Sequence, residues 1–94
     1  MNIKQLLRVA DTELYRQTQK HLTDIERQVL SACLEGISYK EMRKEIPKSH
    51  DQLKRVGARL WKKLSSAFGE EIHKNNIRGT LERYLEDREA EDSS

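Results

Sequence analysis

Lys and Arg side chains gather in residues 38–65, where their type and number suit the binding of a polyanion. This segment holds nine basic residues against three acidic ones, a local charge of +6, whereas residues 80–94 carry −4. Local positive potential steers polyanions even though the whole chain has a net charge of only +2. The alternative interpretation is that these side chains form no more than the solvated face of a helix.

Two kinds of contact to double-stranded DNA are expected from this segment. In the first turns of a basic helix over about 50–66, His50, Asp51, Lys54 and Arg55 would project toward base edges, and the forked guanidinium of Arg55 matches guanine O6 and N7. The other basic side chains are expected to neutralise phosphates, and free amides at the helix start would bind one too. The candidate DNA-binding residues are Lys40, Arg43, Lys44, Ser49, His50, Asp51, Lys54, Arg55, Arg59, Lys62 and Lys63.

Three helices with clear start signals would position these side chains. Each start pairs an N-cap residue with Glu or Gln three positions later: Thr23 with Glu26, Ser38 with Glu41, and Ser49 with Gln52. Gly36 is expected to end the first helix, Pro47 to stop the second at about Ile46, and Gly69 to end the third. A helix, a short turn and a basic helix with one apolar side are what a helix-turn-helix needs in the major groove.

Apolar spacing predicts which side of the basic helix is buried. Leu53, Val56, Gly57, Leu60 and Leu64 share a narrow arc. A glycine inside a helix costs on the order of 1 kcal/mol against alanine, so Gly57 predicts a close backbone approach to one of the two preceding helices. Two further residues have a functional and a structural interpretation, and packing is favoured for both: Trp61 at the core edge over base stacking, and Cys33 in the core over a redox thiol.

Two helices are expected outside the core motif of residues 22–65. A helix over 2–18 and another over about 75–87 each carry an apolar face, and the acidic tail over 87–94 is expected to fray. The sequence thus predicts one all-α helix-turn-helix domain over 1–94 with five helices, allowing only for a short hairpin near 70–74. The two flanking apolar faces also predict a homodimer. The apolar positions are Ile3, Leu6, Leu7, Ala10, Leu14, Ile77, Leu81, Tyr84 and Leu85.

The sequence contains few motifs that would indicate another class of function. The three histidines are scattered and the single cysteine has no partner at ligand spacing, so no metal or cofactor is expected. There is no phosphate-binding glycine loop and no nucleophile motif, so no enzymatic activity is expected. No apolar run reaches the roughly 20 residues of a membrane span, and a lone cysteine suits a reducing compartment. We therefore expect a cytoplasmic protein that does not bind membranes.

Residues 22–64 resemble the LuxR-type helix-turn-helix of the winged-helix superfamily. The matching string is LTDIERQVLSACLEGISYKEMRKEIPKS, followed by LWKKL at the end of the basic helix. The resemblance implies DNA contacts from Lys54 and its neighbours. LuxR-type proteins often carry small or β-branched residues early in that helix, whereas this chain has His50, Asp51 and Gln52. Asp51 would repel phosphate unless it accepts a hydrogen bond from cytosine, so base preference does not carry over.

A closer resemblance covers residues 9–83. The strings VADT, LTDIERQVL, EGISYKEM, VGARLWKKLSSAFGE and NNIRGTLER are similar to the N-terminal helix-turn-helix module of cyanobacterial signalling ATPases of the NB-ARC and WD-repeat type, also called vWA-MoxR-associated. In those proteins the module is joined to signalling domains. The resemblance therefore implies a signalling ATPase or another protein as a partner, and either a stand-alone member or an excised N-terminal module.

Two functions follow from these patterns. The first is a sequence-specific transcriptional regulator that places the basic helix over about 50–66 in the major groove as a homodimer. The second is a protein-interaction adaptor of a signalling or defence ATPase system that keeps the helix-turn-helix shape. Salt-dependent binding to duplex DNA separates them, because an adaptor should ignore DNA at physiological salt.

Overall fold

The computed structural model describes residues 2–92, and side chains as far as Arg88. Within that range the chain forms helices joined by turns and contains no strand, so the all-α prediction is confirmed and the hairpin allowed for near 70–74 is not formed. The helices are α1 (Ile3–Thr18), α2 (Asp24–Leu34), α3 (Tyr39–Met42), α4 (His50–Phe68) and α5 (Ile77–Asp92).

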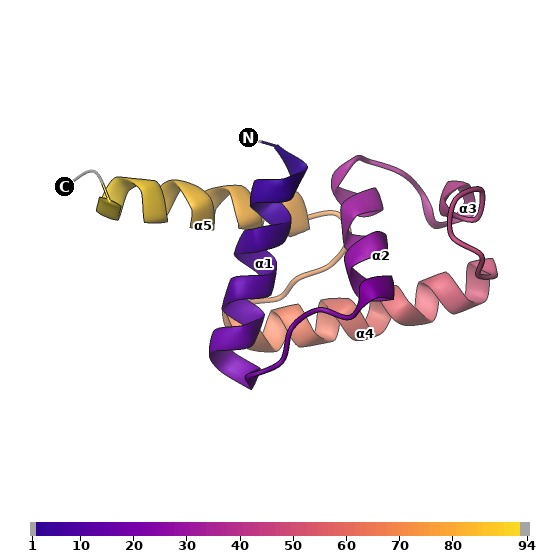
Figure 1. Cartoon of the computed structure of the whole chain (residues 1–94), viewed down its shortest axis with the longest axis horizontal. Helices are drawn as coiled ribbons and strands as arrows, with labels where there is room; N and C mark the ends of the chain where they lie inside the picture. Colours follow the sequence, from indigo (N-terminus) through magenta and orange to yellow (C-terminus); the bar gives the residue numbers. More distant parts are fainter. Residues whose placement is uncertain (1, 93–94) are drawn as a thin grey trace.

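The long helix α4 is the base on which the other helices are arranged. Figure 1 shows α1 and α2 standing side by side across α4, with α3 over the N-terminal end of α4. α5 packs against α1 and projects away from the rest, which gives the molecule a longest dimension of 46 Å. One side of α4 is therefore covered by α1, α2 and α3, and the opposite side is left outward.

One apolar core joins all five helices. The arc predicted on α4 is buried at Leu53, Gly57, Leu60 and Leu64, and Val56 is half-buried. Around it pack buried side chains from the other helices and from the segments between them, which are Leu6, Val9, Ala10, Leu14, Leu22, Val29, Leu30, Cys33, Leu34, Met42, Ile46, Ile72, Ile77 and Leu81. Val9 had not been assigned to the core from sequence.

Much of the apolar face of each flanking helix is used inside the monomer. The apolar side of α1 packs on α4 and α5, and α5 buries Ile77 and Leu81 in the same core. Among the described residues the only large apolar side chain that is exposed is Tyr15, at 41%. Ile3, Leu7, Tyr84 and Leu85 are half-buried on these helices, and the homodimer stays a prediction.

The predicted N-caps are confirmed at all three positions, and the reciprocal capping box at two of them. Thr23 with Glu26, and Ser49 with Gln52, each form a reciprocal capping box. At α3 only one half forms, with the Ser38 hydroxyl accepting from the Glu41 amide. A box that had not been predicted pairs Asn2 with Gln5 at α1. Gly36 and Gly69 end helices with φ of 83° and 68°, as predicted.

Two helix boundaries differ from the prediction. The predicted helix up to Ile46 is regular only over Tyr39–Met42, and residues 43–46 continue as turns. α5 begins at Ile77 because the Asn76 side chain accepts from the His73 amide and holds a turn in front of it. α5 is helical to Asp92, beyond the predicted end at about 87, and its Glu, Arg and Ala residues favour a helix. Residues 93–94 of the tail expected to fray lie outside the described part.

Gly57 allows a side chain of α3 to lie on α4. The phenol of Tyr39 covers the Gly57 backbone, accepts a hydrogen bond from Trp61 Nε1 at 3.0 Å, and lies under the Lys74 ammonium, 4.7 Å from the ring centroid. The close approach predicted at Gly57 is therefore made by a side chain of α3 rather than by its backbone. Trp61 is half-buried in this contact, in agreement with the packing interpretation.

Candidate nucleic-acid interface

The outward side of α4 presents the predicted DNA-binding residues to solvent. His50, Asp51, Lys54, Arg55, Arg59 and Lys62 are all exposed, in the pattern expected opposite the buried arc. Ser49 caps the helix, and its hydroxyl accepts from the Gln52 amide, so this oxygen is already engaged in the fold. Lys40, Arg43 and Lys44 are also exposed, on α3 and the turn after it.

Ion pairing separates the basic residues of the chain into two groups. Arg16, Arg27, Lys63, Arg78 and Arg83 each contact a carboxylate within 4 Å. No described carboxylate pairs with the other candidate cations, which are Lys40, Arg43, Lys44, Lys54, Arg55, Arg59 and Lys62. Their charge is therefore left uncompensated at the surface.

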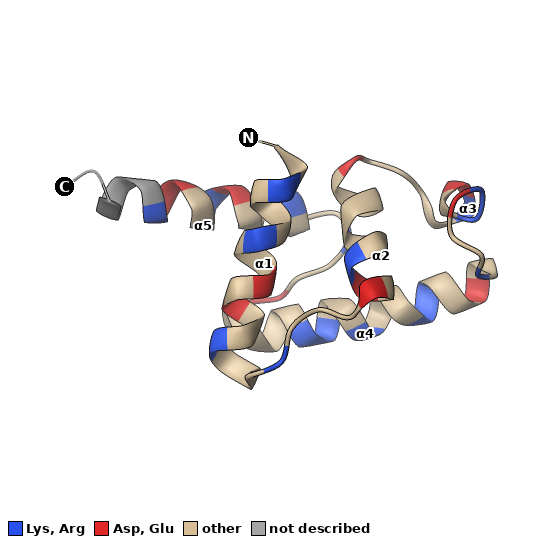
Figure 2. Ribbon diagram, viewed as in Figure 1, with Lys and Arg blue, Asp and Glu red and all other residues tan. Residues whose placement is uncertain are grey.

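The basic residues form a continuous zone rather than scattered positions. Figure 2 shows Lys and Arg along α4 and, at one end of α4, at the foot of α1 and in the loop that follows it. Acidic residues lie on α5 and on the sides of α1 and α2, and also at α3 and at the start of α4. The long rod of α4 and its basic side are thus exposed together, which is the geometry that a groove-binding helix needs.

Lys63 is exposed, but its ammonium is engaged in an ion pair within the fold. Its Nζ donates to Glu26 Oε2 at 2.8 Å, and this bond ties α4 to the start of α2. Burial alone would raise the pKa of Glu26, but hydrogen bonds from Lys63 and from the Thr23 amide outweigh it and hold the pKa below its ordinary value. A charge committed to Glu26 is less available to a phosphate.

This pair gives a testable dependence of stability on pH. Because the folded-state pKa of Glu26 is lowered, its contribution is present above the ordinary value of 4.5 and is lost as pH falls through the folded value. We expect Glu26→Gln to lower the free energy of unfolding by roughly 1–2 kcal/mol at neutral pH and by less in acid. Urea titrations from pH 7 to pH 3 measure it, with the exposed Asp24→Asn as control. A deficit that does not shrink in acid would contradict the assignment.

Three basic-zone residues were missed by the sequence reasoning. Lys20 and His21, in the loop between α1 and α2, line a groove of about 530 Å³ together with Arg59 and Lys62 of α4, and Arg16 is exposed at the end of α1. They lie far from α4 in sequence, and only the packing of α1 on α4 brings them to its basic side. The basic charge of residues 38–65 gave no indication that these three residues belong to the same zone.

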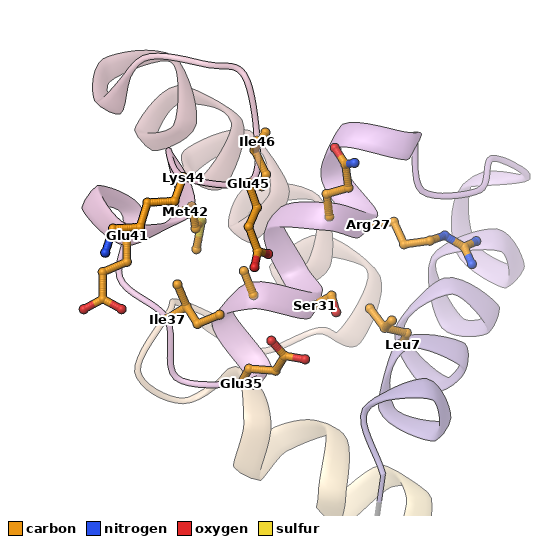
Figure 3. Close-up of a pocket in the computed structure, with 12 residues that line it drawn as sticks. Leu7, Arg27, Ser31, Glu35, Ile37, Glu41, Met42, Lys44, Glu45 and Ile46 are labelled. Atoms are coloured by element: carbon orange, nitrogen blue, oxygen red, sulfur yellow. The ribbon is translucent and has the colours of Figure 1, made fainter.

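A second groove lies between α1, α2 and the α3 turn, with a volume of about 620 Å³. Figure 3 shows Leu7 of α1 on one side and Ile37 and Met42 on the other, with α2 forming its base. Glu35, Glu41 and Glu45 contribute acidic groups to its lining, against Arg27 and Lys44. None of the residues predicted to read bases lies in it.

The remaining candidate sites are structural or absent in the described residues. The Cys33 thiol is buried, and burial raises its pKa to about 11, so it is protonated and inert at neutral pH. The side chains described up to Arg88 contain no group of His, Cys, Asp and Glu that could hold a metal. None of the helices searched is both long and apolar enough to cross a membrane.

A protein-family comparison found one match. The model for the N-terminal helix-turn-helix of vWA-MoxR-associated proteins matches residues 1–84. Searches of the curated proteins and of the solved structures found no match. The match agrees with the second resemblance drawn from the sequence, while the LuxR-type likeness and the cyanobacterial NB-ARC assignment stay predictions.

Proposed function

The chain belongs to the family of N-terminal helix-turn-helix modules of vWA-MoxR-associated proteins, and from this premise we propose that it binds double-stranded DNA. α4 would enter the major groove with its first turns, as a recognition helix does. Arg55 would read guanine and Lys54 a guanine or a phosphate, while Arg59, Lys62 and the α3 residues Lys40, Arg43 and Lys44 would hold the backbone. As a regulator of transcription, the module would use this readout to select its sites.

The observation that supports this proposal most is the set of unpaired cations on α4. Lys54, Arg55, Arg59 and Lys62 all lie outward from a helix whose other side is fully packed, and no described acid compensates them. Evenly mixed charge is what an ordinary solvated helix surface shows. A predominantly basic surface, with Asp51 as its acidic exception, on a rod that fits the major groove favours a polyanion of that shape.

Selection of bound sequences from random duplex DNA tests the proposal. We expect enrichment of a short motif that contains guanine where Arg55 reaches the base edges. Recovery of a random pool with retained affinity would mean that the module holds the backbone without reading bases. No recovery at moderate salt would contradict DNA binding altogether.

A homodimer on DNA stays a prediction. Two α4 helices about 34–36 Å apart would match two half-sites one turn apart. Because α1 and α5 use much of their apolar faces inside the monomer, we expect the contact to form on DNA and to include polar surfaces. Light scattering of the free protein and of the DNA complex measures this, and one copy per duplex under both conditions would contradict a dimer.

The groove between α1, α2 and the α3 turn favours a second candidate, an adaptor. Its apolar lining and three carboxylates suit an apolar helix flanked by Lys or Arg. The family description associates its members with vWA and MoxR proteins, so such a helix in one of those proteins is the occupant we propose. Titration with a purified MoxR ATPase and a purified vWA protein of the same system tests this.

A matched pair of variants identifies the groove in that titration. Ala32→Glu adds a charge to the half-buried wall of the groove, while Gln17→Glu adds the same charge on the exposed side of α1. The adaptor candidate expects loss of protein binding only for Ala32→Glu. Equal binding by both variants, or no binding by the original chain, would exclude this groove as the docking site.

A further inference from the structure

The groove between the end of α1 and the second half of α4 is built almost entirely from basic and apolar groups. Lys20 and His21 line it from the loop after α1, Leu14 and Thr18 from α1, and Arg59, Lys62, Lys63 and Ser66 from α4. No acidic residue lines it. Lys20, Arg59 and Lys62 have no carboxylate partner among the described side chains.

The loop that carries Lys20 is held in place by the fold. Gln19 ends α1 in the left-handed conformation, with φ of 63°. The Thr18 hydroxyl accepts from the Lys20 amide at 3.2 Å and donates to the Leu14 carbonyl at 2.7 Å, with the Lys20 carbonyl also within 3.3 Å. Because the backbone is fixed, ordering the Lys20 side chain on a ligand costs only the entropy of that side chain.

Asp11 fixes the other side of the same loop. Its carboxylate accepts from His21 Nδ1 and from the Leu22 amide, both at 2.8 Å, and the His21 ring stacks on Tyr15 with centroids 4.4 Å apart. Burial alone would raise the pKa of Asp11, but these hydrogen bonds outweigh it and lower the pKa. A preformed loop with one free ammonium is thus presented beside α4.

We propose that this groove binds a phosphate of the DNA backbone through Lys20, next to the phosphate contacts of Arg59 and Lys62. The inference rests on the proposed DNA binding and extends it beyond the helix-turn-helix motif. Continuity supports it, because Arg59 and Lys62 belong both to the outward side of α4 and to the lining of the groove. Figure 2 shows the same continuity, with basic residues passing from α4 to the foot of α1.

The position of the groove assigns it a role without base preference. Lys62 follows Arg55 by about two helical turns, roughly 10 Å along the axis, so the groove lies where α4 leaves the major groove. The DNA backbone that borders the major groove would pass between α4 and the loop. The contact would fix the angle of α4 on the duplex and add affinity that is equal for all sequences.

Lys20→Gln tests this proposal, with Lys4→Gln as the matched control. Both replace an exposed, unpaired lysine by the same residue, and Lys4 lies at the opposite end of α1. Affinity for one duplex is measured between roughly 50 and 200 mM salt for the intact chain and both variants, with melting temperatures as a check on folding. We expect Lys20→Gln to weaken binding several-fold and to reduce the salt slope by about 0.9, while Lys4→Gln changes little.

The outcomes separate this inference from the function on which it rests. If the original chain binds DNA and Lys20→Gln binds with the same slope, the groove is not a phosphate site and DNA binding stands. If both variants lose affinity equally, the effect is one of net charge and the inference is overturned. If the original chain does not bind duplex DNA, both proposals fail.

Discussion

Gly57→Leu is expected to destabilise the domain by several kcal/mol, about 3 kcal/mol or more. A Cβ at Gly57 would meet Tyr39 Oη well inside van der Waals contact and would lie 2.9 Å from its Cζ. Tyr39 cannot move away freely, because it is bonded to Trp61, covered by Lys74 and half-buried. Thermal or urea unfolding measures the loss. A variant that melts within a degree or two of the original chain would mean that Gly57 does not hold this contact.

The chain contains its own control for helix propensity. Gly79 lies in α5, and a Cβ added there meets nothing within 4 Å. Gly79→Leu should therefore gain roughly 0.5–1 kcal/mol from propensity alone, the opposite sign to Gly57→Leu. A second check removes the obstacle: in a Tyr39→Ala background, Gly57→Ala should no longer destabilise. Persistence of the penalty there would show that something other than Tyr39 occupies the space.

Arg55→Ala should weaken binding to the preferred duplex by about 1–3 kcal/mol and relax preference at one base position. Lys62→Ala should instead weaken all sequences alike and lower the salt slope by about one unit. Both residues are exposed and unpaired on the same helix, so the expected difference comes from their positions and from the forked guanidinium of Arg55. Arg55 lies in the half that would enter the groove, and Lys62 lies where the helix leaves it.

Titrations of both variants against a selected and a random duplex at several salt concentrations measure these effects. Equal, sequence-independent losses would contradict base readout by Arg55, although phosphate binding by both residues would remain. If Arg55→Ala left the affinity for DNA unchanged while Lys62→Ala lowered it strongly, the DNA contact would lie on the second half of α4. The adaptor candidate expects neither variant to matter, because DNA is then not the ligand.

Most of the fold could be predicted from residues that are close together in the sequence. The pairs Thr23 with Glu26 and Ser49 with Gln52 are three residues apart, so each helix start depends on side chains that meet in any helical turn. The buried arc of α4 could also be predicted, because its apolar residues recur with the period of a helix. Asn2 with Gln5 obeys the same rule and was overlooked.

The features that sequence did not predict depend on contacts between distant segments. Tyr39 of the short helix α3 lies over Gly57. The spacing of residues predicted a close approach at Gly57 to one of the two preceding helices, but not the side chain that makes it. Lys63 had been grouped with the phosphate contacts, but the arrival of Glu26 from α2 engages it. The groove at Lys20 forms only when α1 packs across α4. Charge counts along the chain show none of these pairings.

The salt dependence of binding between the intact chain and a duplex tests the central claim most directly. If the unpaired cations of α4 and its surroundings contact the backbone, the logarithm of the association constant should fall linearly with the logarithm of salt concentration, by about 0.9 for each phosphate engaged. We predict a slope of several units and measurable affinity at physiological salt. No binding to duplex DNA, or an affinity that does not change with salt, would contradict the account.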